Sequence, residues 1–155
     1  MDPTILLVPL PALTAMTGLF WFVLGLVLGA VFIVLARRLG LPGERRLLAL
    51  GLVVAALIYV GFAVASAGGA WIAAELGGVV VFGGLAVLGL KRSPMSLAVG
   101  WALHPVWDAG LHLMGAGAAF APTWYVVACI SFDFLVGGYI AARFRALPTA
   151  SEATG

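Results

Sequence analysis

Runs of about 20 apolar residues recur along this chain, and short basic or glycine-rich connections separate them. As a helix, a run of that length crosses the hydrocarbon core of a bilayer, which is about 30 Å thick. Hydrophobic residues make up 64% of the 155 positions and charged residues only 9%. A water-soluble domain of this size needs more polar surface. The sequence therefore predicts an all-α integral membrane protein whose main partner is the lipid bilayer.

Five transmembrane helices are predicted, over residues 13–35, 47–64, 70–90, 95–118 and 123–142. They form a single domain over residues 1–145. Three prolines in residues 2–11 favour an extended or interfacial lead-in, because proline fixes φ and lacks a backbone donor. Residues 146–155 have little apolar content, and we expect a disordered tail there.

The basic residues predict the orientation of the bundle. All eight lie in the first loop, the third loop or the C-terminal flank (Arg37, Arg38, Arg45, Arg46, Lys91, Arg92, Arg143, Arg145). With five spans these three places share one side, so the positive-inside rule gives an outside N-terminus and a cytoplasmic C-terminus. Because the basic residues bracket apolar runs, they do not form the solvated patch that binds nucleic acid.

Glycines in the spans favour close helix packing. Gly25 and Gly29 form a GxxxG face in the first span. Spans three and five carry three pairs of adjacent glycines (Gly77, Gly78, Gly83, Gly84, Gly137, Gly138). We expect these faces to pack tightly, within the bundle or between copies of the chain in a homo-oligomer.

The segment Trp101–Met114, WALHPVWDAGLHLM, carries the densest polar pattern. It places His104, Asp108 and His112 four residues apart, so on a helix they form one stripe along about 12 Å of axis. An ionisable group in hydrocarbon costs roughly 2.5–3.5 kcal/mol even on the lenient insertion scale. We therefore expect the stripe to face the bundle interior and to meet partners there.

Depth in the membrane predicts which groups meet. Counted inward from the outer span ends at about 1.5 Å per residue, Glu75 and His112 both lie roughly 7–9 Å deep. Asp108 and Asp133 lie at roughly 9–15 Å, and His104 at about 21 Å. We expect Glu75 to approach His112, and Asp133 to approach Asp108 or His104.

A second stripe lies on the fifth span. Tyr125, Cys129 and Asp133 repeat the four-residue spacing, so they share a face that can oppose the first stripe. Within the fourth span, Pro105 removes one helical hydrogen bond and predicts a kink beside His104. Together the two stripes predict a polar pocket between spans three, four and five.

Three functions are compatible with such a pocket. Imidazole and carboxylate groups are typical ligands of a divalent metal, zinc or iron, and the candidate ligands are His104, Asp108, His112, Glu75 and Asp133. One ion cannot reach residues i and i+8, so either one histidine is not a ligand or two ions flank Asp108. Alternatively the groups relay protons or carry a cation, or they only pair with one another and hold the helices together.

The metal interpretation implies an intramembrane hydrolase or oxygenase that acts on an apolar, lipid-like substrate entering sideways from the bilayer. Its candidate catalytic residues are Asp108, Asp133, Cys129 and Tyr125. Two alternatives belong to other classes: a proton or cation carrier, and a structural or ligand-binding accessory subunit of a membrane complex.

Two motifs carry a resemblance. His104 to His112 follows H-x-x-W-D-x-x-x-H, and Trp124 to Tyr139 follows W-Y-x-x-x-C-x-x-x-D-x-x-x-x-x-Y. Together they resemble a family of small, functionally uncharacterised multi-pass membrane proteins of bacteria, which implies a location in the inner membrane. The run PVWDAGLHLMGAGAAF is also similar to a segment of the tryptophan-rich sensory/translocator proteins, five-span bundles that bind porphyrins and sterols. There the segment opens the second span, whereas here it lies in the fourth and contains Asp108 and His112.

Overall fold

The computed structural model describes residues 10–66 and 68–145, and every regular element in that part of the chain is a helix. In order these are α1 (Leu10–Arg37), α2 (Gly40–Ser66), α3 (Gly69–Lys91), α4 (Pro94–Asp108), the π-helix η1 (Ala109–Leu113), the 3-10 helix η2 (Ala116–Ala119) and α5 (Thr123–Arg145). The predicted all-α class is confirmed for these residues. The predicted tail and most of the predicted lead-in lie outside the described residues.

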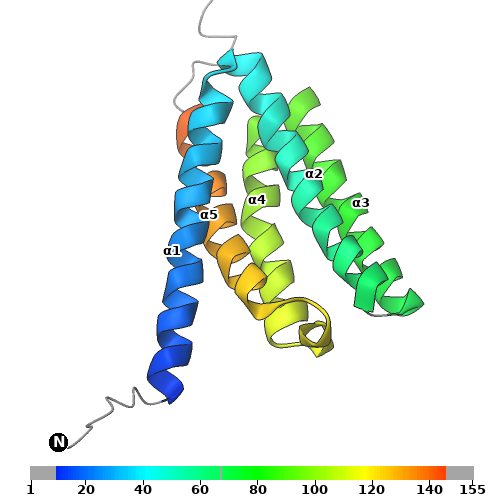
Figure 1. Cartoon of the computed structure of the whole chain (residues 1–155). Coiled ribbons are helices and arrows are strands. Elements are labelled where there is room, and N and C mark those ends of the chain that lie inside the picture. The colour runs from blue at the N-terminus through cyan, green and yellow to red at the C-terminus, as the bar shows by residue number, and fades with distance from the viewer. Residues whose placement is uncertain (1–9, 67, 146–155) are drawn as a thin grey trace, which may run out of the picture.

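The long helices run alternately up and down (Figure 1). α1 packs along α5, α5 along α4, and α2 along α3, while α4 also contacts α3. α1 contacts α2 much less than it contacts α5, although a short turn joins them. In Figure 1 the two helices therefore diverge from that turn.

Four helices of the described chain are long and apolar enough to cross a membrane: Thr14–Arg37, Gly40–Ser66, Gly69–Lys91 and Thr123–Arg145. Their outward faces carry large apolar side chains such as Phe20, 59% exposed, and Val80, 75% exposed. Such faces suit contact with lipid and not with water. The predicted fourth span, 95–118, is shorter and less regular than expected, because its α-helix ends at Asp108 and the π-helix at Leu113.

The first turn lies earlier than the sequence predicted. The predicted spans leave residues 36–46 as a connection, but the turn falls at Arg38 and Leu39, and Gly40 has a positive φ of 68°. Gly40 adopts this left-handed conformation without the steric cost that a side chain brings. Pro42 lies within the first turn of α2, where its missing N–H is not needed. As a result Glu44 belongs to a helix and not to a loop.

The GxxxG face of α1 packs closely within the bundle, as predicted, and its neighbour is α5. A Cβ atom at Gly25 would collide with the carbonyl oxygen of Ala128 and with Ser131 Oγ, and one at Gly29 would lie 3.2 Å from Leu135. Ser131 Oγ donates to the Phe22 carbonyl of α1 at 2.7 Å. The absence of a side chain at Gly25 therefore allows a polar side chain to join the two helices inside the membrane.

The other glycines follow the prediction only in part. Gly78 packs against Trp107 of α4, and a Cβ atom at Gly137 would lie 3.3 Å from the backbone and Trp101 Cβ of α4. The remaining four, Gly77, Gly83, Gly84 and Gly138, have no described neighbour within 4 Å of an added Cβ atom. The prediction of tight packing within the bundle is therefore wrong for these four glycines, which lie on outward helix faces.

An apolar layer fills the half of the bundle nearer its basic end. Leu48, Leu52, Leu97, Val136 and Ile140 are each 0% exposed and belong to one cluster. Next to it, Trp101 Nε1 donates to the Leu48 carbonyl at 3.1 Å, so α4 is joined to α2. This layer lies between the buried polar residues of the bundle and its basic end.

Replacing Gly25 with alanine should separate α1 from α5, because the new methyl group meets a backbone carbonyl that cannot move away. We expect a loss of roughly 1–3 kcal/mol of stability, typical of overpacking. Gly18→Ala is the matched control, because no described atom lies within 4 Å of a Cβ atom there. Thermal unfolding in detergent measures both variants. Equal melting temperatures would contradict the close α1–α5 contact.

Candidate metal centre

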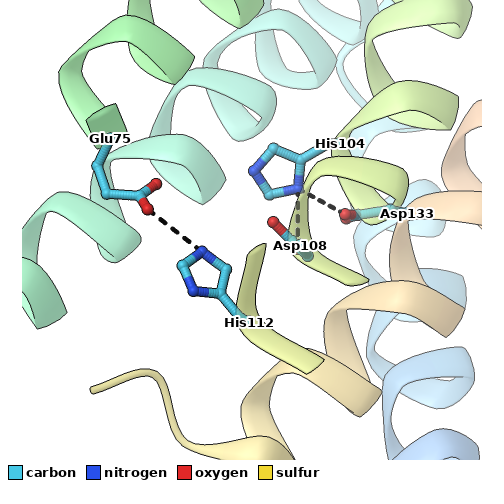
Figure 2. Close-up of polar contacts among 5 residues, drawn as sticks. All are labelled: Glu75, His104, Asp108, His112 and Asp133. Carbon is cyan, nitrogen blue, oxygen red and sulfur yellow. Dashed lines mark hydrogen bonds and ion pairs between the residues drawn. The ribbon is translucent and has the colours of Figure 1, made fainter. Parts of the chain in front are cut away.

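His104, Asp108 and Asp133 form one buried group. The Nδ1 of His104 is hydrogen-bonded to Asp133 Oδ2 at 2.8 Å and lies 3.3 Å from Asp108 Oδ2 (Figure 2). The three side chains are 1%, 0% and 1% exposed. One ligand atom from each lies within 4.8 Å of the others, so the group could hold a single metal ion.

The close approach of α5 to α4 positions this group. His104 and Asp108 lie on successive turns of α4 and therefore share a face. At Gly137 the backbones of the two helices nearly touch. Asp133 lies one turn before Gly137 on α5, so its carboxylate reaches the His104 ring directly. The predicted approach of Asp133 to Asp108 or His104 is confirmed.

A second pair lies beside the first. His112 Nε2 is 3.3 Å from Glu75 Oε1, and both side chains are buried (Figure 2). This is the Glu75–His112 contact that the depth calculation predicted. Neither residue belongs to the three-residue group, in agreement with the argument that one ion cannot reach residues i and i+8.

The backbone around His112 is irregular in a way that the sequence only partly indicated. A kink was expected at Pro105, and the π-helix begins four residues later, with Met114 N–H donating to the Ala109 carbonyl at 3.0 Å. π-Helical turns are rare and often occur at functional sites. Gly117 then passes close to the ring: a Cβ atom there would lie 2.5 Å from His112 Nδ1. Only glycine fits beside His112 at this point.

Tyr59 of α2 connects the two groups, and sequence reasoning missed it because it assigned the site to spans three, four and five. Its ring stacks on His112 with centroids 4.4 Å apart and lies 5.9 Å from the His104 ring. The available signal was that Tyr59 is the one polar side chain in the predicted span 47–64. The site therefore includes α2 as well.

Many polar atoms of this site have no hydrogen-bond partner among the described residues. They are Tyr59 Oη, Glu75 Oε1, both carboxylate oxygens of Asp108, both ring nitrogens of His112 and Asp133 Oδ1. Buried polar atoms in folded proteins are nearly always paired. A cluster of unpaired carboxylate and imidazole atoms is therefore suited to a bound cation, protons or water.

A lateral cleft of about 340 Å³ lies beside the site, between α1, α2 and α5. Its walls are almost entirely apolar, and its polar residues are Tyr125, Cys129 and Asp133, the predicted stripe of α5. Asp133 thus contacts His104 and also lines the cleft. Cys129 is a half-buried free thiol. Tyr125 packs toward Tyr59, with ring centroids 5.6 Å apart.

Comparison with known proteins identifies a family. Residues 20–146 match the family DUF6010, described as a family of unknown function. The chain belongs to DUF6010. The matched region contains every residue of the site, and it agrees with the resemblance to an uncharacterised family noted from the two motifs. No curated protein and no solved structure matches the chain. The likeness to tryptophan-rich sensory proteins stays a prediction.

This DUF6010 protein has a further buried carboxylate at its basic end. Glu44 is 1% exposed, accepts a hydrogen bond from the Tyr139 hydroxyl and lies 3.6 Å from Arg143 Nε. Nearby, Arg45 donates to the Gly89 carbonyl at 2.6 Å, so it caps the end of α3. Sequence reasoning placed Glu44 in the first loop and named Tyr139 only as the last residue of a motif. These contacts join α2 to α3 and α5, and they explain why the Glu44 carboxylate is buried.

Replacing Tyr139 with phenylalanine removes the hydrogen bond to Glu44. A hydrogen bond to a charged group contributes about 1.5–3 kcal/mol, so the melting temperature should fall measurably. Tyr59→Phe is the matched control, because within the described chain the Tyr59 hydroxyl has no hydrogen-bond partner. Thermal unfolding is compared in chelator-treated protein. A larger loss for Tyr59→Phe than for Tyr139→Phe would contradict this assignment.

Proposed function

We propose that this protein is an integral membrane enzyme that binds a divalent metal ion, zinc or iron, through His104, Asp108 and Asp133 and acts on a lipid-like substrate. The observation that carries the proposal is the three-residue group itself: three ligand atoms within 4.8 Å of one another, in side chains at most 1% exposed. Burial of that kind favours a bound ion over a solvated cluster of charges.

The charge of the group supports a cation. Two carboxylates and one imidazole lie together in a low-dielectric interior, where uncompensated charge is costly. A divalent ion would balance the two carboxylates and pair with the unpartnered oxygens of Asp108. Mixed imidazole and carboxylate ligands suit zinc and iron.

The proposed chemistry uses the surrounding residues. Zinc would lower the pKa of a water molecule and so supply hydroxide as the nucleophile for ester or amide hydrolysis, and iron would supply oxygen activation. The Glu75–His112 pair would hold or accept a proton beside the three-residue group. Tyr125 and Cys129, on the cleft wall, would contact the substrate directly. The apolar packing around the group would keep bulk water away.

A lipid-like substrate is supported by the cleft. It lies between helices whose outward faces suit lipid, and its lining is apolar apart from the stripe of α5. A substrate dissolved in the bilayer would reach Asp133 from the side, without first entering water. A strongly polar substrate would lose its hydration on the same path.

The same carboxylates would also suit a cation or proton carrier. A carrier needs a polar path on both sides of its site. Toward the basic end, however, the layer formed by Leu48, Leu52, Leu97, Val136 and Ile140 is fully buried and apolar. This layer favours a site reached from one side only. The outward glycines of α3 would support the other alternative, an accessory or oligomeric subunit.

We further propose five spans, with the N-terminus outside. α4 and η1 together provide 15 and 5 residues of continuous helix, enough for about 30 Å. The ends of α1, α3 and α5 that carry the basic residues lie at one end of the bundle (Figure 1). Positive charge favours the cytoplasmic side.

A fusion protein tests this orientation. A fluorescent protein that matures only in the cytoplasm, fused after Arg145, should fluoresce in bacteria. A fusion that is stably expressed but dark would show that the C-terminus lies outside.

Asp108→Asn tests the metal centre. The substitution preserves shape but removes a charged ligand, and we expect metal affinity to fall at least about tenfold while the fold persists. Glu44→Gln is the matched control, because Glu44 is an equally buried carboxylate outside the group. Bound metal is measured by elemental mass spectrometry and the fold by thermal unfolding. Wild-type protein without stoichiometric metal, after gentle purification in zinc or iron, would refute the proposal.

A further inference from the structure

The cleft between α1, α2 and α5 has the form of a site for one hydrocarbon chain. Along α1 its lining runs from Trp21 to Phe32, about 16 Å of helix axis. Along α5 it runs from Trp124 to Asp133. Its volume of about 340 Å³ falls in the range of small-molecule sites, at the lower end. It is therefore long, narrow and apolar.

One end of this cleft carries an unpartnered polar atom. Asp133 lines the cleft and is 1% exposed, and within the described chain its Oδ1 has no hydrogen-bond partner. Its other oxygen, Oδ2, accepts from His104. A buried carboxylate oxygen without a donor is costly, so a ligand that brings a hydrogen-bond donor to this point is favoured.

Charge limits the kind of donor. Asp108 and Asp133 already place two carboxylates at this point, and an added anionic headgroup would be repelled in a low-dielectric interior. With a divalent ion present the group is balanced, and a neutral headgroup preserves that balance. A hydroxyl both donates to Oδ1 and remains neutral.

We propose that the cleft is the binding site for a single-chain neutral amphiphile, a long-chain alcohol, with its hydroxyl on Asp133 and its hydrocarbon chain along α1 and α5 toward Trp21 and Trp124. This inference rests on the proposed function, because a long-chain alcohol is the product that hydrolysis of a lipid ester would leave beside the metal centre. The headgroup lies about 15 Å from the outer end of α5, near the middle of the bilayer.

The position of α1 makes the cleft possible. α1 is joined firmly to α5 at Gly25 and Ser131 but contacts α2 sparsely. Val54 and Ile58 of α2, 45% and 37% exposed, line the opposite wall. The opening between α1 and α2 therefore faces the lipid, and a chain can slide in from the bilayer.

The test uses hexadecanol carrying a photoreactive diazirine on its chain, with the matching fatty acid as the second probe, on full-length protein in nanodiscs. Labelled peptides are mapped by mass spectrometry. We expect the alcohol to label residues 21–32 and 124–133 preferentially, and the fatty acid to label them about tenfold less. Labelling spread evenly over all lipid-facing helices, or equal labelling by the acid, would overturn the proposal.

Variants that fill the cleft sharpen the test. Ala55→Phe and Val54→Phe, both on the α2 wall, should reduce alcohol labelling about tenfold. Ala73→Phe is the matched control on an exposed position of α3 outside the cleft. If the Ala55→Phe variant does not fold, the Val54→Phe variant decides the test, because Val54 lies at the half-exposed mouth of the cleft. Unchanged labelling in the folded variant would overturn the proposal.

Metal content is measured on the same samples. Bound metal with unspecific labelling would overturn this inference and leave the metal centre standing. Specific labelling without bound metal would overturn the metal-dependent enzyme and leave the alcohol site standing.

Discussion

The cost of placing charge in hydrocarbon determines how the central helices of this protein pack. His104 and Asp133 come from different helices, and their 2.8 Å hydrogen bond satisfies one nitrogen and one oxygen that lipid cannot hydrate. The backbones must approach closely for this contact, and Gly137 allows that approach. Glu75 and His112 join α3 to η1, which follows α4, because these two polar side chains also need partners in an apolar interior. The apolar layer nearer the basic end then packs around helices whose relative positions these contacts constrain.

Much of this arrangement could be predicted from helix geometry alone. The four-residue spacing placed His104 and Asp108 on one face, and a depth count of about 1.5 Å per residue matched Glu75 to His112. The GxxxG face of α1 was also recognisable, because only glycine permits such an approach. These predictions depend on the spacing of residues along a helix and on the length of each span, and both can be read directly from a sequence.

Other features depend on neighbours that periodicity does not reveal. Tyr59 lies in an apolar run and becomes part of the site only because α2 packs so that its ring stacks on His112. Glu44 lies between two pairs of arginines in the sequence, in a predicted loop. The turn before Gly40 instead starts α2 early and buries Glu44 against Tyr139. The four outward glycines show the converse, since small residues mark a packing face without stating whether this chain or another covers it. Tertiary context decides each case.

Cys129 has a practical consequence. It is the one cysteine of the chain, and it lies on the wall of the cleft, one turn from Asp133. A spin label or fluorophore attached to this sulfur needs no cysteine-free background. The native protein thus already contains a single position for a reporter group. A reporter there would detect a molecule that moves from the bilayer into the cleft.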